Sequence, residues 1–213
     1  MNISDIQKQI QQWISSHNPS VQLQYQVPLL GEGGTCSLFG ELDDVPFKLQ
    51  DVLSEQHLEL LNQVQSVVDW VQTHLNVDWF GVYLKRVSND QSAVLTKLAY
   101  YGAPSRAEFP LTPEFAELSN NTSVGLSGEK RLINSVAEYR QQGGEYYTCD
   151  PKVNSELCWP IISPNISSAK QQGSEILGII DAECFNENKF DLQVQKQFEA
   201  VCNVLADILT TSK

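Results

Sequence analysis

The sequence predicts an α+β protein in which helices at its N- and C-terminal ends pack on one face of a central antiparallel sheet of five to six strands. Apolar residues repeat at helical spacing over residues 51–74 and again after Asp191. Between these two segments the apolar period changes to two, and clusters of Gly, Asn, Ser and Pro interrupt it. Each end helix has one apolar stripe, and one face of a sheet is the natural place to bury both stripes.

The first fifty residues predict an N-terminal extension. Ile3, Ile6, Ile10 and Trp13 recur at helical spacing and indicate a short amphipathic helix. Prolines and a glycine cluster then break up residues 17–34, which we expect to form a loop with one strand over residues 21–27. We therefore divide the chain into an extension, residues 1–50, and a main domain, residues 51–213.

Two long helices begin and end this main domain. The first is expected over residues 51–74 and the second after a cap near Asp191. Their apolar stripes are Leu61, Val64, Val68, Val71 and Leu75, and then Val194, Phe198, Val201, Leu205 and Ile208.

Five segments between the helices alternate like strands. They are residues 79–84, 93–99, 131–136, 155–162 and 175–183. Residues 120–123, with the sequence NNTS, and residues 163–174 are predicted to be polar loops.

Composition limits the partners that the chain can have. The net charge is −12, with 26 acidic against 14 basic residues, so we expect neither nucleic acid nor an anionic membrane as a partner. No apolar run approaches the roughly 18 residues of a membrane helix, and the first residues lack the pattern of a secretory signal. A cytoplasmic location is therefore expected.

The five cysteines are odd in number, scattered and never arranged as CxxC, and there are only three histidines. This pattern argues against a zinc site and a disulfide framework, and we expect no metal and no cofactor.

Strand alternation gives the sheet one apolar face and one face with reactive groups, because side chains two residues apart point the same way. On the second face we place Trp79 and Tyr83 from one strand, Glu156 and Cys158 from another, and Asp181 and Glu183 from the last. Asp181 and Glu183 end an apolar run, so they suit a buried cation such as an ammonium group. The two aromatic residues suit an alkyl or thioether group, and a partly buried Glu156 could donate a proton.

Each of these residues also has a structural interpretation. Trp79 and Tyr83 could be packing aromatics, and Asp181 and Glu183 could be an ordinary strand end in solvent. Burial in the core or in the lining of a pocket is the commoner role for Cys158, and core packing for Cys36, Cys184 and Cys202. Cys149 differs, because it follows the polar loop GGEYYT and precedes Asp150, which favours a thiol in a pocket.

Three segments resemble a known family: DWFGVYL, CDPKVNSELCWPI and ILGIIDAE. The chain from residue 51 onward resembles a GAF domain and, within that superfamily, the free methionine-R-sulfoxide reductases. The resemblance implies that Cys149 is the reactive cysteine and Glu156 its acid. It also implies that four residues contact the substrate: Trp79, Tyr83, Asp181 and Glu183. Glu183 stands where the family has an aspartate, which has a shorter side chain.

The chain departs from that family at two positions. Reductases of this kind usually carry two further cysteines. In this chain Arg106 and Gly125 stand at the positions where the resemblance places those two cysteines. A second thiol normally condenses with the sulfenic acid left on the reactive cysteine, and thioredoxin or a similar donor then reduces the disulfide. Turnover by Cys149 would need an external thiol or a new internal partner, for which Cys158 is our choice.

Three hypotheses follow from these observations. The chain could be an enzyme that reduces free methionine-R-sulfoxide, or a GAF module that binds a small amino-acid-like ligand without turnover. It could also be a regulatory GAF domain that forms a homodimer through its helical ends. The retained acids argue against the third hypothesis, and the missing cysteines separate the first two.

Overall fold

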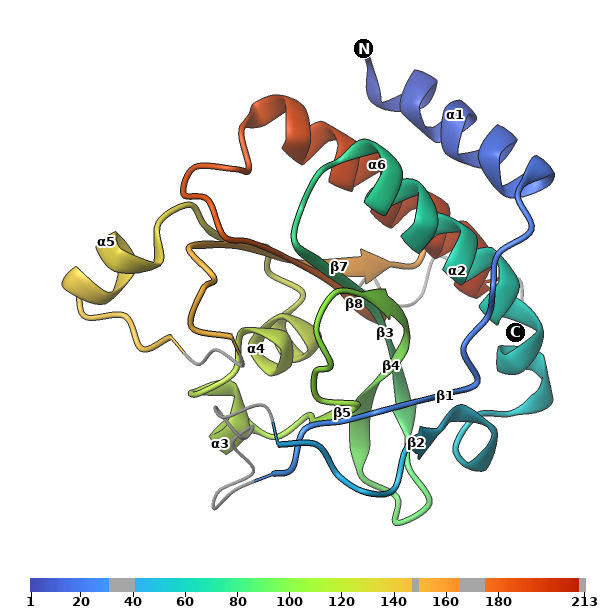
Figure 1. The fold of residues 1–213 in the computed structure, drawn as a ribbon, viewed down its shortest axis with the longest axis horizontal. Coiled ribbons are helices and arrows are strands. Elements are labelled where there is room, and N and C mark those ends of the chain that lie inside the picture. The colour runs from blue at the N-terminus through green and yellow to red at the C-terminus, as the bar shows by residue number, and fades with distance from the viewer. Residues whose placement is uncertain (31–40, 147–149, 165–174, 211–213) are drawn as a thin grey trace, which may run out of the picture.

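The computed structural model describes residues 1–30, 41–146, 150–164 and 175–210 (Figure 1). Its main sheet has six antiparallel strands in the order β5-β4-β3-β8-β7-β6. In that order they span Glu108–Pro110, Ala93–Tyr101, Trp79–Val87, Ile176–Cys184, Ser155–Ile162 and Arg131–Ile133. The predicted α+β arrangement with a central antiparallel sheet is confirmed.

Two long helices, α2 (Glu55–His74) and α6 (Leu192–Thr210), lie side by side over one face of this sheet, and α1 (Ile3–Ser16) packs against them (Figure 1). All five predicted stripe residues of α2 are buried. Helix α2 begins at Glu55, four residues later than expected, because a 3-10 turn at Leu49–Asp51 precedes it. Ser54 caps the helix by accepting a hydrogen bond from the His57 amide. Asp191 caps α6 as predicted, since its Oδ1 accepts hydrogen bonds of 2.8 Å from two backbone amides.

The N-terminal fifty residues share the core of the main domain. Ile6, Ile10, Tyr25 and Leu49 are buried in the same apolar cluster as the inner faces of α2 and α6. The proposed boundary at residue 51 stays a prediction, but the described part of the extension is packed against the main domain as one body.

A second, two-stranded sheet forms within the extension from β1 (Gln24–Tyr25) and β2 (Phe47–Lys48). The predicted strand over residues 21–27 is therefore shorter than expected. Beyond this sheet the two segments stay paired, because Leu29 N donates to Glu41 O and Asp43 N to Val27 O, both at 2.9 Å. Pro28 and Leu42 face each other between these bonds. We call residues 27–29 and 41–43 the N-terminal ladder.

The prediction of a polar loop at residues 120–123 is wrong. Helix α4 begins there, at Asn120–Ser127, because Ser119 accepts a hydrogen bond from the Thr122 amide and caps the first turn. Gly128, with a φ of 71°, ends the helix in the left-handed conformation that glycine adopts easily. The NNTS sequence has turn-like composition, but packing of Val124 against the sheet favours a helix.

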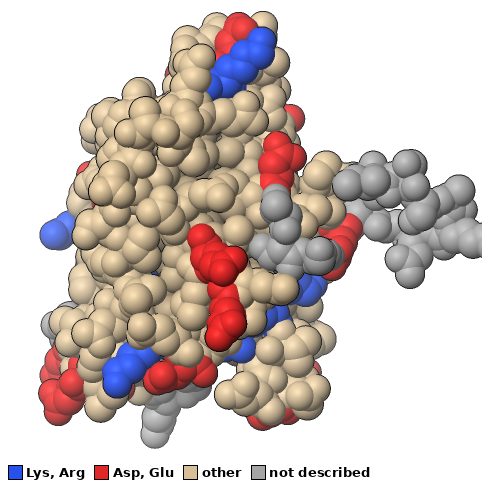
Figure 2. All heavy atoms as spheres, turned by 90° about the vertical axis from the view of Figure 1, so that its right-hand side faces the viewer, with Lys and Arg blue, Asp and Glu red and all other residues tan. Residues whose placement is uncertain are grey.

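Other short elements differ from the expectations too. Helices α3 (Pro113–Ala116) and α5 (Val136–Gln141) and strand β5 are additional, and β6 is shorter than the strand predicted over residues 131–136. Most of the loop predicted at residues 163–174 lies outside the described residues. None of the described helices is long and apolar enough to cross a membrane. On the face in Figure 2, the described Lys and Arg side chains lie in small separate groups rather than in one basic patch.

Candidate functional site

The two faces of the sheet differ as the alternation predicts. Phe80, Leu157 and Ile180 pack in the large core beneath the helices. Trp79, Tyr83 and Cys158 belong to a separate apolar cluster on the opposite face, together with residues of β5 and α4.

Strand register brings the acids of the second face together. In the pairing of β7 with β8, Glu156 lies opposite Glu183, and Cys158 lies opposite Asp181. On the other side of β8, Trp79 lies opposite Glu183. Because facing residues of an antiparallel pair point to the same face, three strands project these side chains into one region. One oxygen of Glu156, one of Asp181 and the Cys158 sulfur lie within 4.8 Å of one another.

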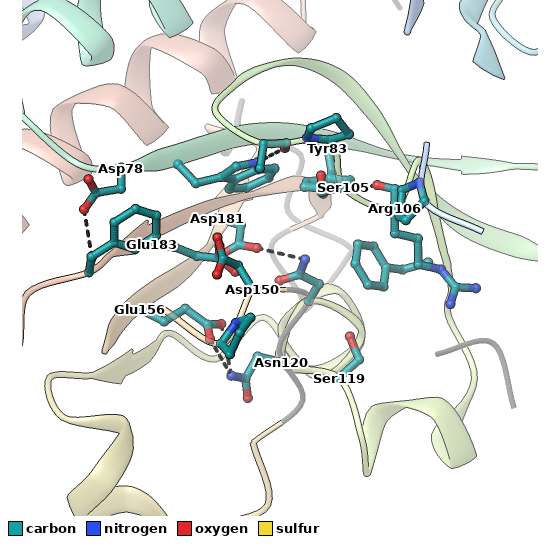
Figure 3. A pocket seen from close by; sticks show the side chains of 18 of the residues that line it. Asp78, Tyr83, Ser105, Arg106, Ser119, Asn120, Asp150, Glu156, Asp181 and Glu183 are labelled. Carbon is teal, nitrogen blue, oxygen red and sulfur yellow. Dashed lines mark hydrogen bonds between the residues drawn. The ribbon is translucent and has the colours of Figure 1, made fainter. Parts of the chain in front are cut away.

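A cavity of about 330 Å³ opens over this region. Its lining has aromatic and apolar walls, several polar residues, five acidic side chains and one basic one, Arg106. The acidic residues are Asp78, Asp150, Glu156, Asp181 and Glu183. Figure 3 shows Glu156, Asp181 and Glu183 pointing toward the same space from β7 and β8. This excess of carboxylates favours a cationic ligand.

Two asparagines at the start of α4 hold two of the acids. Asn120 Nδ2 donates to both carboxylate oxygens of Glu156, at 3.0 and 3.1 Å (Figure 3). Asn121 Nδ2 donates to Asp181 Oδ2 at 3.0 Å. Sequence reasoning missed both residues. The signal that could have found them is Ser119, a typical N-cap residue just before them, with Gly128 as the helix end.

Asp181 is the most exceptional acid of the site. Its side chain is buried, and its Oδ1 has no hydrogen-bond partner within the described part of the chain. Burial raises the pKa of this carboxyl well above its ordinary value, and the charge of Glu156 raises it further. A cation bound at Oδ1 would offset both effects.

Glu156 is also buried, and burial raises its pKa. The nearby Tyr146 hydroxyl, the hydrogen bonds from Asn120 and the Arg131 guanidinium oppose this shift in pKa. Arg131 Nη1 donates to Asn120 Oδ1 at 3.1 Å, so the asparagine links the guanidinium to the carboxyl group. Arg131 and Asn120 also line a second, more polar cavity of about 290 Å³.

The two predicted aromatic residues form part of the cavity wall. Trp79 Nε1 donates to Ala103 O at 3.0 Å, which fixes the indole across Gly81, where a Cβ atom would overlap the ring. Tyr83 packs edge-to-face on Phe109, with ring centroids 5.5 Å apart. Both aromatic residues are buried, so only their edges and faces on the cavity side can meet a ligand.

Behind this wall lies Lys97 of β4, a fully buried cation that sequence reasoning missed. Its Nζ lies 3.8 Å from the ring centroid of Tyr100 and 5.9 Å from that of Trp79. It donates to Ser105 O at 2.8 Å and Ser105 Oγ at 2.7 Å, and Ser105 lines the cavity. Lys97 therefore fixes the cavity wall from behind. The sequence signal that could have indicated its burial is the position of this lysine within an otherwise apolar strand.

The cysteines divide between the two faces. Cys158 is fully buried, is not among the cavity-lining residues, and donates from Sγ to Asn121 Oδ1 at 3.3 Å. Burial raises the pKa of its thiol well above the ordinary value, and Asp181 and Glu156 raise it further. Cys184 and Cys202 pack in the core beneath the helices, which confirms the structural interpretation for both.

Cys36 and Cys149 lie outside the described residues. The two residues that follow Cys149, Asp150 and Pro151, line the cavity. Of the two positions where the resemblance places further cysteines, Arg106 lines the cavity and Gly125 is not among its lining residues. Gly125 lies where α4 meets the sheet, and a Cβ there would come within 2.9 Å of two leucine side chains.

Glu156, Cys158 and Asp181 also form the single group of metal-ligating residues within the described ranges. Two carboxylates and one thiol are a mixed donor set, and two of the three already accept hydrogen bonds from asparagines. An ammonium group suits the carboxylates without requiring the buried thiol to ionise.

Comparison with known proteins identifies the fold. No model of a known protein family matches the sequence, and no curated protein matches it. Among solved structures, a type II free methionine-R-sulfoxide reductase from Thermoplasma acidophilum is 16% identical, with a TM-score of 0.56 over 74% of this chain and 96% of that one. The GAF domain of an Acinetobacter phosphoenolpyruvate-protein phosphotransferase is 12% identical, with a TM-score of 0.56 over 98% of this chain and 93% of that one.

A GAF domain region from Geobacter sulfurreducens is also similar, at 15% identity and a TM-score of 0.53 over 73% of this chain and 96% of that one. At these identities the likeness concerns the fold. The chain therefore has the GAF fold, which it shares both with a free methionine-R-sulfoxide reductase and with GAF domains of other proteins.

Proposed function

We propose that the cavity binds a small amino-acid-like ligand through its ammonium group, with Asp181 and Glu183 as the main partners. The observation that carries this proposal is the buried Asp181, whose Oδ1 has no hydrogen-bond partner among the described residues. An ammonium group offers three donors and a positive charge, so it would satisfy this oxygen and stabilise the neighbouring carboxylates. Trp79 and Tyr83 would contact the apolar part of the ligand.

We further propose that the ligand is free methionine-R-sulfoxide and that Cys149 reduces it. Support comes from the motif resemblance, from the fold shared with a reductase, and from Asp150, which is covalently joined to Cys149 and lines the cavity. The Cys149 thiolate would attack the sulfoxide sulfur, and the sulfoxide oxygen would pass to the cysteine sulfur as a sulfenic acid. The sulfoxide gains two electrons and leaves as methionine, while the cysteine loses two.

Glu156 suits the role of acid in this step. Its raised pKa favours a protonated carboxyl group, which can donate its proton to the sulfoxide oxygen as the bond to sulfur breaks. Asn120 would hold that carboxyl group in place through its hydrogen bonds.

Recycling of Cys149 requires two further thiol equivalents. One thiol condenses with the sulfenic acid and releases water, and a second thiol reduces the resulting disulfide and restores the cysteine. Cys158 remains our proposed internal partner, and thioredoxin the proposed donor. The burial of Cys158 and the raised pKa of its thiol favour a slow attack, so we expect a small external thiol to support faster turnover than thioredoxin.

The alternative function is a sensor that binds the same ligand without chemistry. What favours it is that Arg106 and Gly125 stand where the resemblance to the reductases places the two further cysteines. A homodimer through the helical ends stays a prediction for either function.

One assay separates the two functions. The protein is incubated with free methionine-R-sulfoxide, with dithiothreitol in one reaction and thioredoxin with its reductase in another, and the methionine formed is measured. We expect methionine with dithiothreitol, none with Cys149→Ser, and wild-type amounts with Cys184→Ser, a matched control on the far face. If Cys158→Ser lost the thioredoxin-dependent rate but kept the rate with dithiothreitol, Cys158 would be supported as the internal partner of Cys149.

Binding is measured separately by isothermal titration calorimetry with methionine sulfoxide in the absence of reductant. Binding without methionine formation in either reaction would favour the sensor. Asp181→Asn should abolish binding and Asp44→Asn, an exposed aspartate, should leave it unchanged. Equal binding by wild type and Asp181→Asn would contradict the ammonium site.

A further inference from the structure

The N-terminal ladder reaches the ligand cavity. Pro28 and Leu42, the facing pair at its centre, both line the cavity that contains Asp181. In Figure 1 residues 26–30 lead from β1 toward α3, and residues 41–46 lead back to β2, so the ladder crosses this end of the molecule. The extension therefore contributes to the site as well as to the core.

Strand β1, which leads into the ladder, is fixed to the main domain through Tyr25. Tyr25 is buried, its hydroxyl donates to Lys97 O at 2.7 Å, and its ring packs edge-on against Tyr100. Lys97 in turn holds Ser105 in the cavity wall through two hydrogen bonds. The same buried lysine thus connects the extension to the wall that contains Ser105.

Leu42 differs from a core leucine in its exposure. It lines the cavity and yet exposes 40% of its surface, while its partner Pro28 is buried. Leu29, beside Pro28, has a similar exposure of 42% but does not line the cavity. An apolar ligand group placed against Leu42 would remove its surface from water, which is favourable in proportion to the area covered.

We propose that Pro28 and Leu42 form an apolar specificity wall, which selects amino acids with a long apolar or thioether side chain over those with a short one. The inference rests on the proposed function for the ligand's ammonium group. Asp181 and Glu183 would bind that group, which all amino acids share, while the ladder would distinguish their side chains. The extension then has a role in recognition that the resemblance to the reductases, which begins at residue 51, does not provide.

The test uses protein with ¹³C-labelled leucine methyl groups, in which Leu42→Ala assigns the Leu42 signals. Three probes are titrated: L-norleucine, with a long apolar side chain; L-alanine, with the same ammonium and carboxylate but a short one; and n-butanol, with the apolar part alone. We expect L-norleucine and n-butanol to shift the Leu42 signals and L-alanine to leave them unchanged. Leu29 should not respond to any probe.

Affinities give an independent readout of selectivity. Leu42→Ala should weaken binding of L-norleucine by about threefold, since part of one leucine surface is no longer covered, and should leave L-alanine unchanged. Leu29→Ala, the matched control, should change neither. An equal loss for both amino acids in Leu42→Ala would indicate a general structural effect and would overturn the wall.

The outcomes separate the wall from the ammonium site. Binding of L-norleucine that requires Asp181 but does not shift Leu42 would overturn the wall and leave the proposed function standing. A Leu42 shift with n-butanol, with no binding of either amino acid, would contradict the ammonium site and would overturn the selection among amino acids, leaving only an apolar contact at Leu42. No Leu42 shift with any probe would overturn the wall.

Discussion

Asn121 joins Asp181 to Cys158 across three elements of the fold. Its Nδ2 donates to Asp181 Oδ2 at 3.0 Å, and its Oδ1 accepts from the Cys158 sulfur at 3.3 Å. The three residues are buried, and they come from α4, β8 and β7. The Asn121 amide therefore provides a hydrogen-bond partner for both Asp181 Oδ2 and the Cys158 thiol.

Replacement of Asn121 tests this arrangement. Asn121→Ala should lower the free energy of unfolding by about 2–4 kcal/mol, because it leaves a buried carboxyl oxygen and a buried thiol without partners. Chemical denaturation followed by circular dichroism measures the change. Asn62→Ala, at an exposed position of α2, should be neutral or slightly stabilising, and an equally small effect of Asn121→Ala would contradict the role of the amide.

Asp181 should make the unliganded protein less stable as the pH rises. Its folded-state pKa is raised, so above about pH 4 the folded protein binds more protons at this group than the unfolded chain, and the free energy of unfolding falls with pH. Asp181→Asn removes this contribution. The variant should exceed wild type in stability by on the order of 1–2 kcal/mol at pH 7, because an amide avoids the cost of a buried charge.

The measurement is the free energy of unfolding of both proteins between pH 3.5 and pH 8 without ligand. The difference between them should be smallest at the acidic end and should grow through the window above the ordinary aspartate range. Asp44→Asn serves as the exposed control. A difference that is constant with pH would show that the Asp181 carboxyl does not titrate abnormally.

Lys97 should be a large contributor to stability although it is a buried cation. Lys97→Ala leaves a void beside Tyr25 and Tyr100 and removes both hydrogen bonds to Ser105, so we expect a loss of about 2–4 kcal/mol. Lys97→Met, which fills most of the space, should recover part of this loss. If Lys97→Ala unfolded at the same denaturant concentration as Lys48→Ala, an exposed control on β2, the lysine would have no structural role.

Gly81 and Trp79 should behave as a coupled pair. A Cβ atom at position 81 would overlap the six-membered ring of Trp79, so Gly81→Ala should destabilise the protein by about 1–3 kcal/mol through overpacking. Trp79→Phe makes room for the added methyl group. In a double-mutant cycle we expect the double variant to be at least about 1 kcal/mol more stable than the sum of the single effects. If the changes in the free energy of unfolding were additive, the two side chains would not be in steric conflict.

Much of the sheet side of the site could be predicted from the sequence. The alternation placed Trp79, Tyr83, Glu156 and Cys158 on one face because strand periodicity is a local property of the backbone. Core packing was predicted for Cys184 as well, and it packs in the core on the opposite face. The role of Cys149 stays a prediction, since it lies outside the described residues.

The helix side of the site was not predictable in the same way. The NNTS segment has the composition of a loop, and it became the first turn of α4 because Ser119 caps it and Val124 packs on the sheet. The burial of Lys97 was not predicted either, because a lysine within a strand usually lies on the solvent face. Its burial depends on aromatic rings from β1 and β3 and on a wall segment, which no local pattern connects.

The amino-acid sequence by itself determined the order of the main elements and the face of the sheet on which each acid and aromatic residue lies. These properties follow from periodicity and capping, which act over a few residues. Only the tertiary structure decided that Asn120 and Asn121 hold the acids, that Lys97 fixes the wall, and that the ladder of the extension reaches the cavity. Those contacts join segments far apart in the chain, and they depend on strand register and on burial, which are settled only when the whole chain packs.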